Sequence, residues 1–336
     1  MSHIDHDFVA YNALIYFWYE SYTTMWTIKF YSYMVCFILF IIFISVANKN
    51  WRNLFGYRFI LGIIFLYMGI NVKDLWFSMV YSFQIINFYG FHICSHTFYF
   101  NTIIAACQFL IGIIFLCILF VMWFNVTDDS NINFGIPILM LVCVFASLML
   151  VSVNDFFTLY LLIELQSFAL YVLVGVNRFS FTGSSTSLKY FVYGSFASCI
   201  LAFGISLIYG FTGTLDFVQL YYIITNLDTS SEFYYDILIG FLLVLVGLMF
   251  KLGIAPFHVW LPDIYEGAPF IVTFFLSIIP KIPVLFILFR VFCFAYDYYH
   301  VIVNFSTPFL FISTCCAVLS IVLVVLVVYM NKLFYV

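Results

Sequence analysis

The stretch GFLLVLVGLMFKLGIAPFHVWLPDIYEGAP (240–269) decides the fold of this chain. Its first part is apolar except for Lys251, and three prolines follow in the part from 255 to 269. Proline lacks the backbone N–H that a helix interior needs, so 255–269 cannot continue as one regular helix. The pattern predicts a membrane helix over 237–256 that is broken near Pro256, with a lysine just before the break.

The composition supports a membrane location for the whole chain. Of 336 residues, 66% are hydrophobic and 8% are charged, whereas a soluble domain carries about 25% charged residues to keep its surface wet. The net charge of −4 is spread along the chain without a basic cluster. Soluble folds and nucleic-acid binding are therefore excluded as interpretations.

The apolar runs predict the number of membrane crossings. A spanning helix needs about 20 mainly apolar residues, and this rule predicts about nine spans. They lie at 30–47, 57–72, 98–123, 134–153, 156–176, 189–210, 237–256, 269–293 and 305–329. Segments 1–29 and 75–91 mix aromatic with polar residues and are predicted to lie at the membrane interface. The predicted fold class is an all-α polytopic membrane protein.

The basic residues near the span ends predict the orientation. Lysine and arginine collect on the side from which a chain is inserted. Six follow odd-numbered spans, namely Lys49, Arg52, Arg58, Arg178, Lys189 and Lys332, and three flank the other side, namely Lys29, Lys73 and Arg290. This bias predicts an N-terminus outside and a C-terminus inside. Arg178, Lys189 and Arg290 are explained by topology, because long side chains near span ends reach the interface easily.

The connections between the spans are also predicted. The small polar run FTGSSTS (181–187) is expected to form a loop between the fifth and sixth spans, and the acidic stretch 211–236 a long loop. Asp155 falls in a very short turn between two spans. Asp263 and Glu266 are expected to face the membrane surface and to cap the next helix.

Glu164 interrupts another apolar run, LLIELQSFALYVLVG (161–175). It lies eight residues into the 156–176 span, which is about 12 Å at 1.5 Å per residue. A carboxylate at that depth needs a cation, and Lys251 is the natural candidate. Two readings stay open: a pair that opens and closes during proton transfer, and a static salt bridge kept for packing.

Lys281 lies in the middle of the 269–293 span, 12 residues from each end, so about 18 Å of helix separates it from either interface. Its side chain cannot reach water from there, and a lone charge at the bilayer centre costs from about 3 to over 10 kcal/mol. Pro280 and Pro283 bracket it and free backbone groups that only protein or water can satisfy. We expect a proton-carrying lysine in a hydrated interior; a buried ion pair that only joins helices is the alternative.

His258 lies two residues after Pro256. A proton relay and a hydrogen-bonded structural histidine are equally compatible with that position. The nine cysteines lie mostly in apolar runs, without a CxxC pair and without a histidine at ligand spacing. No phosphate loop, catalytic triad or haem or iron–sulphur ligand set is present. The sequence predicts no metal, no bound cofactor and no redox chemistry in this chain itself.

Several motifs together resemble the NADH dehydrogenase subunit 2 family, the mitochondrial counterpart of bacterial subunit N, an antiporter-like membrane subunit of respiratory complex I. The motifs are ELQSFALYVLVG (164–175), LKYFVYGSFAS (188–198), GISLIYGFTGTLDF (204–217), GLMFKLGIAPFHVWLPDIYEGAP (247–269) and SIIPKIPVLFILFRVF (277–292). The similarity is dense over 135–293. It implies that Glu164 and Lys251 are the family's coupled pair. It also implies that Lys281 leads toward a central hydrophilic axis and that His258 is the histidine of the family motif.

The resemblance implies a role in proton translocation within NADH:ubiquinone reductase. NADH, FMN, iron–sulphur clusters and ubiquinone are then expected elsewhere in the complex, and the partners would be other membrane-arm subunits and lipids. The implied location is the mitochondrial inner membrane, with the N-terminus on the intermembrane-space side and the C-terminus in the matrix. The abundance of Phe (46) and Tyr (26), residues with AT-rich codons, suggests an organelle-encoded chain.

The resemblance also implies a domain organisation. The family has three N-terminal helices, two inverted five-helix units and a final helix. We therefore expect an interfacial segment at 1–29, the three-helix group at 30–133, the first unit at 134–293, and the first helix of an incomplete second unit at 294–336. The remaining helices are expected from a separate chain. Two other functions stay open: a multi-subunit cation/proton antiporter, and a structural subunit that has lost pumping.

Overall fold

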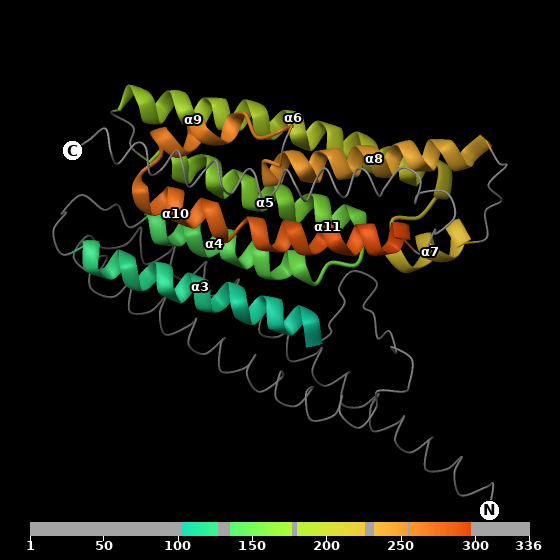
Figure 1. Ribbon diagram of the computed structural model, residues 1–336, viewed down its shortest axis with the longest axis horizontal. Coiled ribbons are helices and arrows are strands. Elements are labelled where there is room, and N and C mark those ends of the chain that lie inside the picture. The colour runs from blue at the N-terminus through green and yellow to red at the C-terminus, as the bar shows by residue number, and fades with distance from the viewer. Residues whose placement is uncertain (1–101, 127–134, 177–179, 226–231, 255, 297–336) are drawn as a thin grey trace, which may run out of the picture.

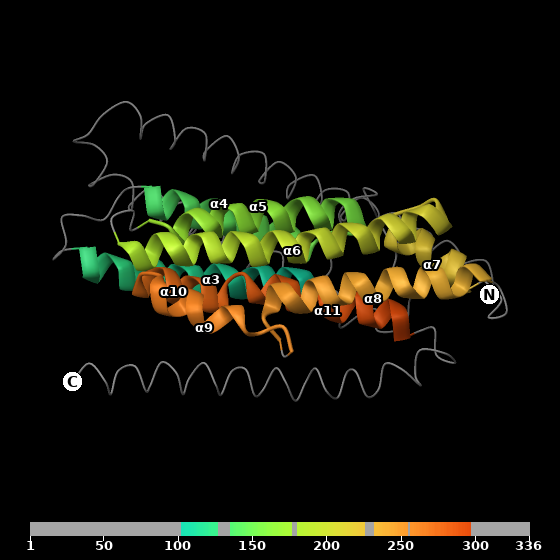
Figure 2. The same ribbon diagram turned by 90° about the horizontal axis from the view of Figure 1, so that it is seen from above.

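The computed structural model describes residues 102–126, 135–176, 180–225, 232–254 and 256–296, and these are almost entirely helical. Figures 1 and 2 show the long helices lying side by side with their axes nearly aligned. The helices are α3 (Thr102–Val126), α4 (Gly135–Val151), α5 (Phe156–Val174), α6 (Phe181–Thr212), α7 (Phe217–Thr225), α8 (Glu232–Leu252), α9 (Trp260–Gly267), α10 (Phe270–Ile278) and α11 (Lys281–Tyr296). The described part is an all-α bundle.

Five segments are long and apolar enough to cross a membrane: Ile103–Phe120, Phe156–Val174, Phe181–Thr212, Tyr235–Leu252 and Phe270–Val291. A shorter apolar helix, Ile136–Val151, lies beside them. The predicted all-α membrane bundle is confirmed. The predicted spans at 30–47, 57–72 and 305–329 and the segments 1–29 and 75–91 lie outside the described residues, so the total of nine spans stays a prediction.

α8 and α9 form the broken helix that the prolines predict. α8 ends at Leu252, and Gly253 has a φ of 68°, a left-handed conformation that glycine adopts without strain. The Gly253 and Ile254 amides cap this end of the helix by donating hydrogen bonds to the carbonyls of Phe250 and Met249, respectively. Helix resumes at Trp260, so the predicted break near Pro256 is confirmed.

The two pieces of the broken helix both pack against α6, which is 32 residues long. Figure 1 shows α8 and α9 following one another along α6. α9 therefore continues the crossing. Asp263 on α9 pairs with Lys189 on α6, with 2.9 Å between the Lys189 Nζ and an Asp263 carboxylate oxygen. The predicted capping role is wrong, because α10 has Pro269 as its N-cap residue and no side-chain cap bond.

The polar run 181–187 is helical, so the predicted loop is wrong. Ser180 caps the helix, accepting a hydrogen bond from the Gly183 amide on its side-chain oxygen. The hydroxyl groups that follow donate to carbonyls three residues earlier, as seen for Ser184, Ser185, Thr186 and Ser187. Because these hydroxyls are satisfied within the helix, α6 can begin at Phe181 instead of near residue 189.

A seam of glycines brings α6 and α8 into close contact. A Cβ on Gly204 would lie 2.8 Å from both the Gly240 carbonyl oxygen and the Val244 amide nitrogen. A Cβ on Gly247 would lie 2.8 Å from the Cβ of Leu201. Small residues at such positions let helix backbones approach within a membrane, where packing drives helix association. The approach of α6 to α8 therefore depends on these glycines.

This seam predicts opposite results for two alanine substitutions on α6. Gly204→Ala should lower the thermal stability of the membrane assembly that contains this chain, by about 1–3 kcal/mol, because its methyl group meets backbone that cannot rotate away. Gly210→Ala is the matched control, since its Cβ would meet nothing within 4 Å. The control should be neutral or slightly stabilising. Thermal unfolding of the two purified assemblies tests this, and equal midpoints would contradict the role of the seam.

The short turn between α4 and α5 caps α5 and pairs with the segment that leads into α7. Asp155 caps α5 by accepting a hydrogen bond from the Thr158 amide (3.0 Å), and its backbone pairs with that of Asp216 in an isolated antiparallel bridge. α7 follows directly after Asp216, inside the acidic stretch that the sequence predicts as a loop. The prediction of a short turn at Asp155 is confirmed, whereas α7 was not predicted.

Arg290 binds the same turn from α11. Its Nη2 donates to the Asn154 Oδ1 (2.9 Å), its Nη1 donates to the Val153 carbonyl, and its guanidinium lies 5.5 Å from the centre of the Phe217 ring. Topology alone was expected to explain this arginine. The structure instead shows that it joins α11 to the α4–α5 turn and to α7, which fixes one end of the bundle.

Candidate proton-transfer site

The buried apolar residues form two separate clusters, and the ionisable residues lie between them. On α5 one cluster takes residues up to Ile163 and the other begins at Ala169. The same division falls between Tyr190 and Leu201 on α6, between Ile254 and Trp260 at the helix break, and between Ile279 and Val284 at α10–α11. We call the intervening residues the polar layer: Glu164, Gln166, Ser167, Ser198, Lys251 at its edge, His258 and Lys281.

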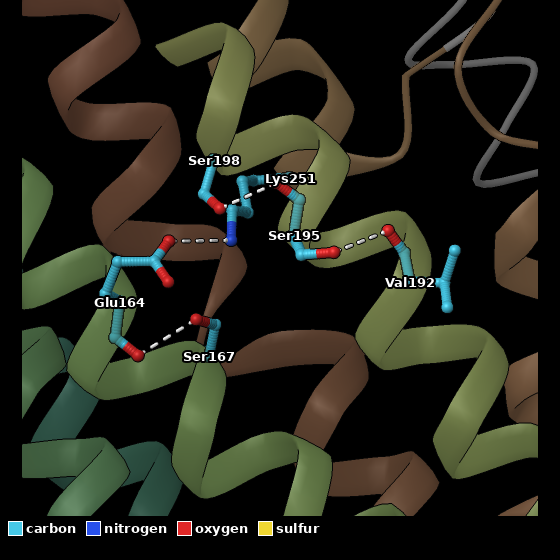
Figure 3. A network of polar contacts seen from close by, with 6 residues as sticks. All are labelled: Glu164, Ser167, Val192, Ser195, Ser198 and Lys251. Carbon is cyan, nitrogen blue, oxygen red and sulfur yellow. Dashed lines mark hydrogen bonds and ion pairs between the residues drawn. The ribbon is translucent and has the colours of Figure 1, made fainter. Parts of the chain in front are cut away.

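Glu164 and Lys251 form a direct ion pair in the polar layer. The Lys251 Nζ lies 3.4 Å from the Glu164 Oε1, and the side chains are 11% and 17% exposed, respectively. Figure 3 shows the pair between α5 and α8, with Ser195 and Ser198 of α6 labelled nearby. The two residues are 87 positions apart in the chain. The predicted pairing of these two side chains is present in the structure.

The helices explain why the two charges are tolerated at this place. Lys251 lies in the last turn of α8, where the partial negative charge of the helix C-terminus favours a cation. Glu164 lies in the middle of α5, and the neighbouring Ser167 hydroxyl donates to the Glu164 backbone carbonyl (2.9 Å). The carboxylate therefore depends on Lys251 for its charge partner.

Lys281 is the first residue of α11, near the middle of the Phe270–Val291 span. α10 ends at Ile278, so the helix interruption predicted at Pro280 is present. Pro283 lies in the first turn of α11, where a missing N–H costs little. Within the described ranges, no carboxylate lies within ion-pair distance of the Lys281 Nζ. The Nζ instead lies 5.7 Å from the centre of the Tyr265 ring.

His258 lies in the turn between α8 and α9 and is half-buried. Its Nδ1 is buried and, among the residues that the structure describes, has no hydrogen-bond partner. The structure thus brings Glu164 and Lys251 together and places Lys281 and His258 in the same layer without a direct contact to the pair. A half-buried imidazole with a spare nitrogen can take and pass a proton.

Two polar residues of the site, one buried and one partly buried, were not predicted from the sequence. Gln166 is 3% exposed and its Nε2 finds no partner in the described part of the chain. Tyr265 contacts Lys281 with its ring. The signal for Gln166 was available, because it is an amide inside an apolar run two residues from Glu164. No signal in the sequence could pair Tyr265 with Lys281, since that contact depends on the packing of α9.

The described residues contain no candidate metal site. In the ranges it describes, no three His, Cys, Asp or Glu side chains gather closely enough to hold an ion. The expectation that this chain binds no cofactor stays a prediction.

Comparison with known proteins places the chain in a family. Residues 153–329, more than half of the chain, match the family described as NADH:quinone oxidoreductase/Mrp antiporter, TM. The chain belongs to this family. The match includes Glu164, Lys251, His258 and Lys281, so the polar layer is part of the family region.

Two relatives of this chain are subunits of an NADH-quinone and an NADH-ubiquinone oxidoreductase. NADH-quinone oxidoreductase subunit N 1 of Acidiphilium cryptum is 45% identical over 170 residues, which are 50% of this chain and 35% of the relative. NADH-ubiquinone oxidoreductase chain 2 of Marchantia polymorpha is 40% identical over 179 residues, 52% of this chain and 37% of the relative. The matched part of the chain therefore spans only about a third of each relative.

The fold is shared with a solved member of a respiratory assembly. A chain of the archaeal membrane-bound sulfane sulfur reductase superposes with a TM-score of 0.63 at 21% identity, covering 78% of this chain and 52% of that one. At this identity the likeness concerns the fold alone. It confirms the antiporter-like helix bundle.

The ion pair predicts an unequal effect of single and double substitutions. Glu164→Gln leaves the Lys251 ammonium group without its partner, so we expect a loss of about 3 kcal/mol or more in the stability of the assembly. The double variant Glu164→Gln/Lys251→Met should be closer to the parent, because no uncompensated charge is left. Thermal unfolding of the purified assemblies measures both. A double variant as unstable as Glu164→Gln would show that the unpaired Lys251 charge does not cause the loss.

Proposed function

We propose that this chain is a membrane-arm subunit of respiratory complex I, the proton-translocating NADH:ubiquinone oxidoreductase, and that it contributes to proton translocation. The observation that carries the proposal is the Glu164–Lys251 ion pair in a polar layer between two apolar clusters. A family that contains NADH-quinone oxidoreductase subunits supports it. Charges inside membrane spans are costly and mark proton or ion pathways.

The proposed mechanism follows from the two states of the ion pair. When Glu164 is within 3.4 Å of the Lys251 Nζ, the carboxylate stabilises the ammonium form by direct attraction. When the pair opens, Lys251 is a buried ammonium group without its carboxylate partner, which favours release of its proton. The proton passes along the layer toward Lys281, with His258 as a relay. A proton that enters from the side opposite Lys281 then protonates Lys251, and the ammonium group pairs again with Glu164.

The cofactors and partners are inferred from the proposed complex and not from residues of this chain. NADH, FMN, iron–sulphur clusters and ubiquinone would be bound by other subunits, and this chain would carry no redox group. Its neighbours would be other membrane-arm subunits and lipids. The Marchantia relative supports a place in the mitochondrial inner membrane. There the N-terminus would face the intermembrane space and the C-terminus the matrix, and the chain would be organelle-encoded.

The proposal predicts that the two lysines are needed for proton transport. In the purified complex reconstituted into vesicles, Lys251→Ala and Lys281→Ala should each lower proton transport coupled to NADH oxidation by about tenfold or more, because each removes a titrating group. Lys189→Ala is the matched control. It also removes a lysine from an ion pair, but that pair is exposed (53% and 54%) and lies outside the polar layer. An assembled Lys251→Ala or Lys281→Ala complex with normal transport would favour the structural role.

The composition of the native assembly separates complex I from an antiporter. The family includes Mrp antiporters as well as NADH:quinone oxidoreductases. We expect the assembly that contains this chain to carry flavin and iron–sulphur clusters, measured by absorbance and mass spectrometry. A stable assembly without them would identify a cation/proton antiporter. The same preparation tests the prediction that a separate chain supplies further helices of the family fold.

A further inference from the structure

The two lysines of the polar layer are held in different ways. Lys251 faces a carboxylate at 3.4 Å, whereas the Lys281 Nζ faces the ring of Tyr265, with 5.7 Å between the nitrogen and the ring centre. An ammonium group within about 6 Å of an aromatic ring face is attracted by the negative potential of that face. Within the described ranges this ring contact is the charge-stabilising interaction that the structure shows for Lys281.

The Tyr265 ring is held in place by the packing of α9 on α6. Trp260 stacks on Tyr190 of α6, with ring centres 5.5 Å apart and an angle of 16° between the planes. Ile264, one residue before Tyr265, is fully buried. At the end of α9, Gly267 lies directly against the Thr186 side chain, where a Cβ would not fit. The position of the ring is therefore decided by the docking of the second half of the broken helix.

The exposed ion pair between Lys189 and Asp263 contributes little to this docking. Both side chains are about half exposed (53% and 54%), and water and salt screen an exposed pair so that it stabilises little. The aromatic stack and the buried Ile264 hold α9 instead. The Tyr265 hydroxyl is buried and has no hydrogen-bond partner in the described part of the chain. The geometry thus points to the ring face, and not the hydroxyl, as the group that acts on Lys281.

We propose that Tyr265 is a positioning residue for proton transfer, whose ring face holds the Lys281 ammonium group in the middle of the bundle. The proposal rests on the function proposed above. A ring attracts the ammonium form and not the neutral amine. Unlike a carboxylate, the ring cannot accept the proton. The ring can therefore hold Lys281 while the lysine is protonated and release it once the proton is lost. No ion pair has to open first. Lys251 needs such a separation from Glu164.

Two substitutions distinguish the ring from the hydroxyl. Tyr265→Leu removes the ring face, and we expect proton transport per NADH oxidised in the reconstituted complex to fall by about tenfold. Tyr265→Phe keeps the ring and removes the unpartnered hydroxyl, so transport should stay within about twofold of the parent. Normal transport in Tyr265→Leu would overturn the proposal. Equal losses in both variants would also overturn it, because the hydroxyl would then be the important group.

Assembly of the complex is checked in each variant by the amount of intact complex per milligram of membrane protein. If Tyr265→Leu does not assemble, Tyr265→Met decides the question, because methionine fills irregular space and lacks a ring. Lys281→Ala separates the two proposals. Normal transport in Lys281→Ala would remove the proposed function itself, whereas a defect in Lys281→Ala with normal transport in the ring-free variants would remove only the role of Tyr265.

Discussion

The contact between Glu164 and Lys251 is the interaction on which the rest of the described structure depends. Each charge stabilises the other, because removing one partner of a buried pair leaves an uncompensated charge that costs several kcal/mol. The pair is 3.4 Å long and joins α5 to α8. Around it the apolar core divides into two clusters. The helices of the bundle therefore enclose a polar layer that lies between the two apolar clusters.

Breaks in the helices make this layer possible. α8 ends one residue after Lys251, and α11 begins at Lys281. A helix end exposes backbone groups and a local dipole, which an unbroken span cannot offer at that depth. The unbroken α6 serves as the support, since both halves of the broken helix pack along it. A continuous helix packed along an interrupted one thus combines a rigid frame with polar groups inside the bundle.

Parts of this arrangement were predictable from the residues and parts were not. The break near Pro256 and the turn at Asp155 follow from local chemistry, because proline and a capping carboxylate act within a few residues. The loop predicted at 181–187 was wrong, since serine and threonine hydroxyls there bond to carbonyls of their own helix. Arg290 was assigned to topology alone, yet it binds Asn154, 136 positions away. No local pattern contains such a pairing.

The sequence by itself determined the all-α membrane class, the approximate positions of the long apolar helices among the described residues, and the ionisable residues that lie inside apolar runs. These depend on hydrophobicity and on the cost of charge in lipid, which are properties of each segment. Only the tertiary structure decided which groups face each ionisable residue. Lys251 meets a carboxylate and Lys281 meets the Tyr265 ring, because the docking of α9 and the close approach of α6 to α8 bring distant segments together.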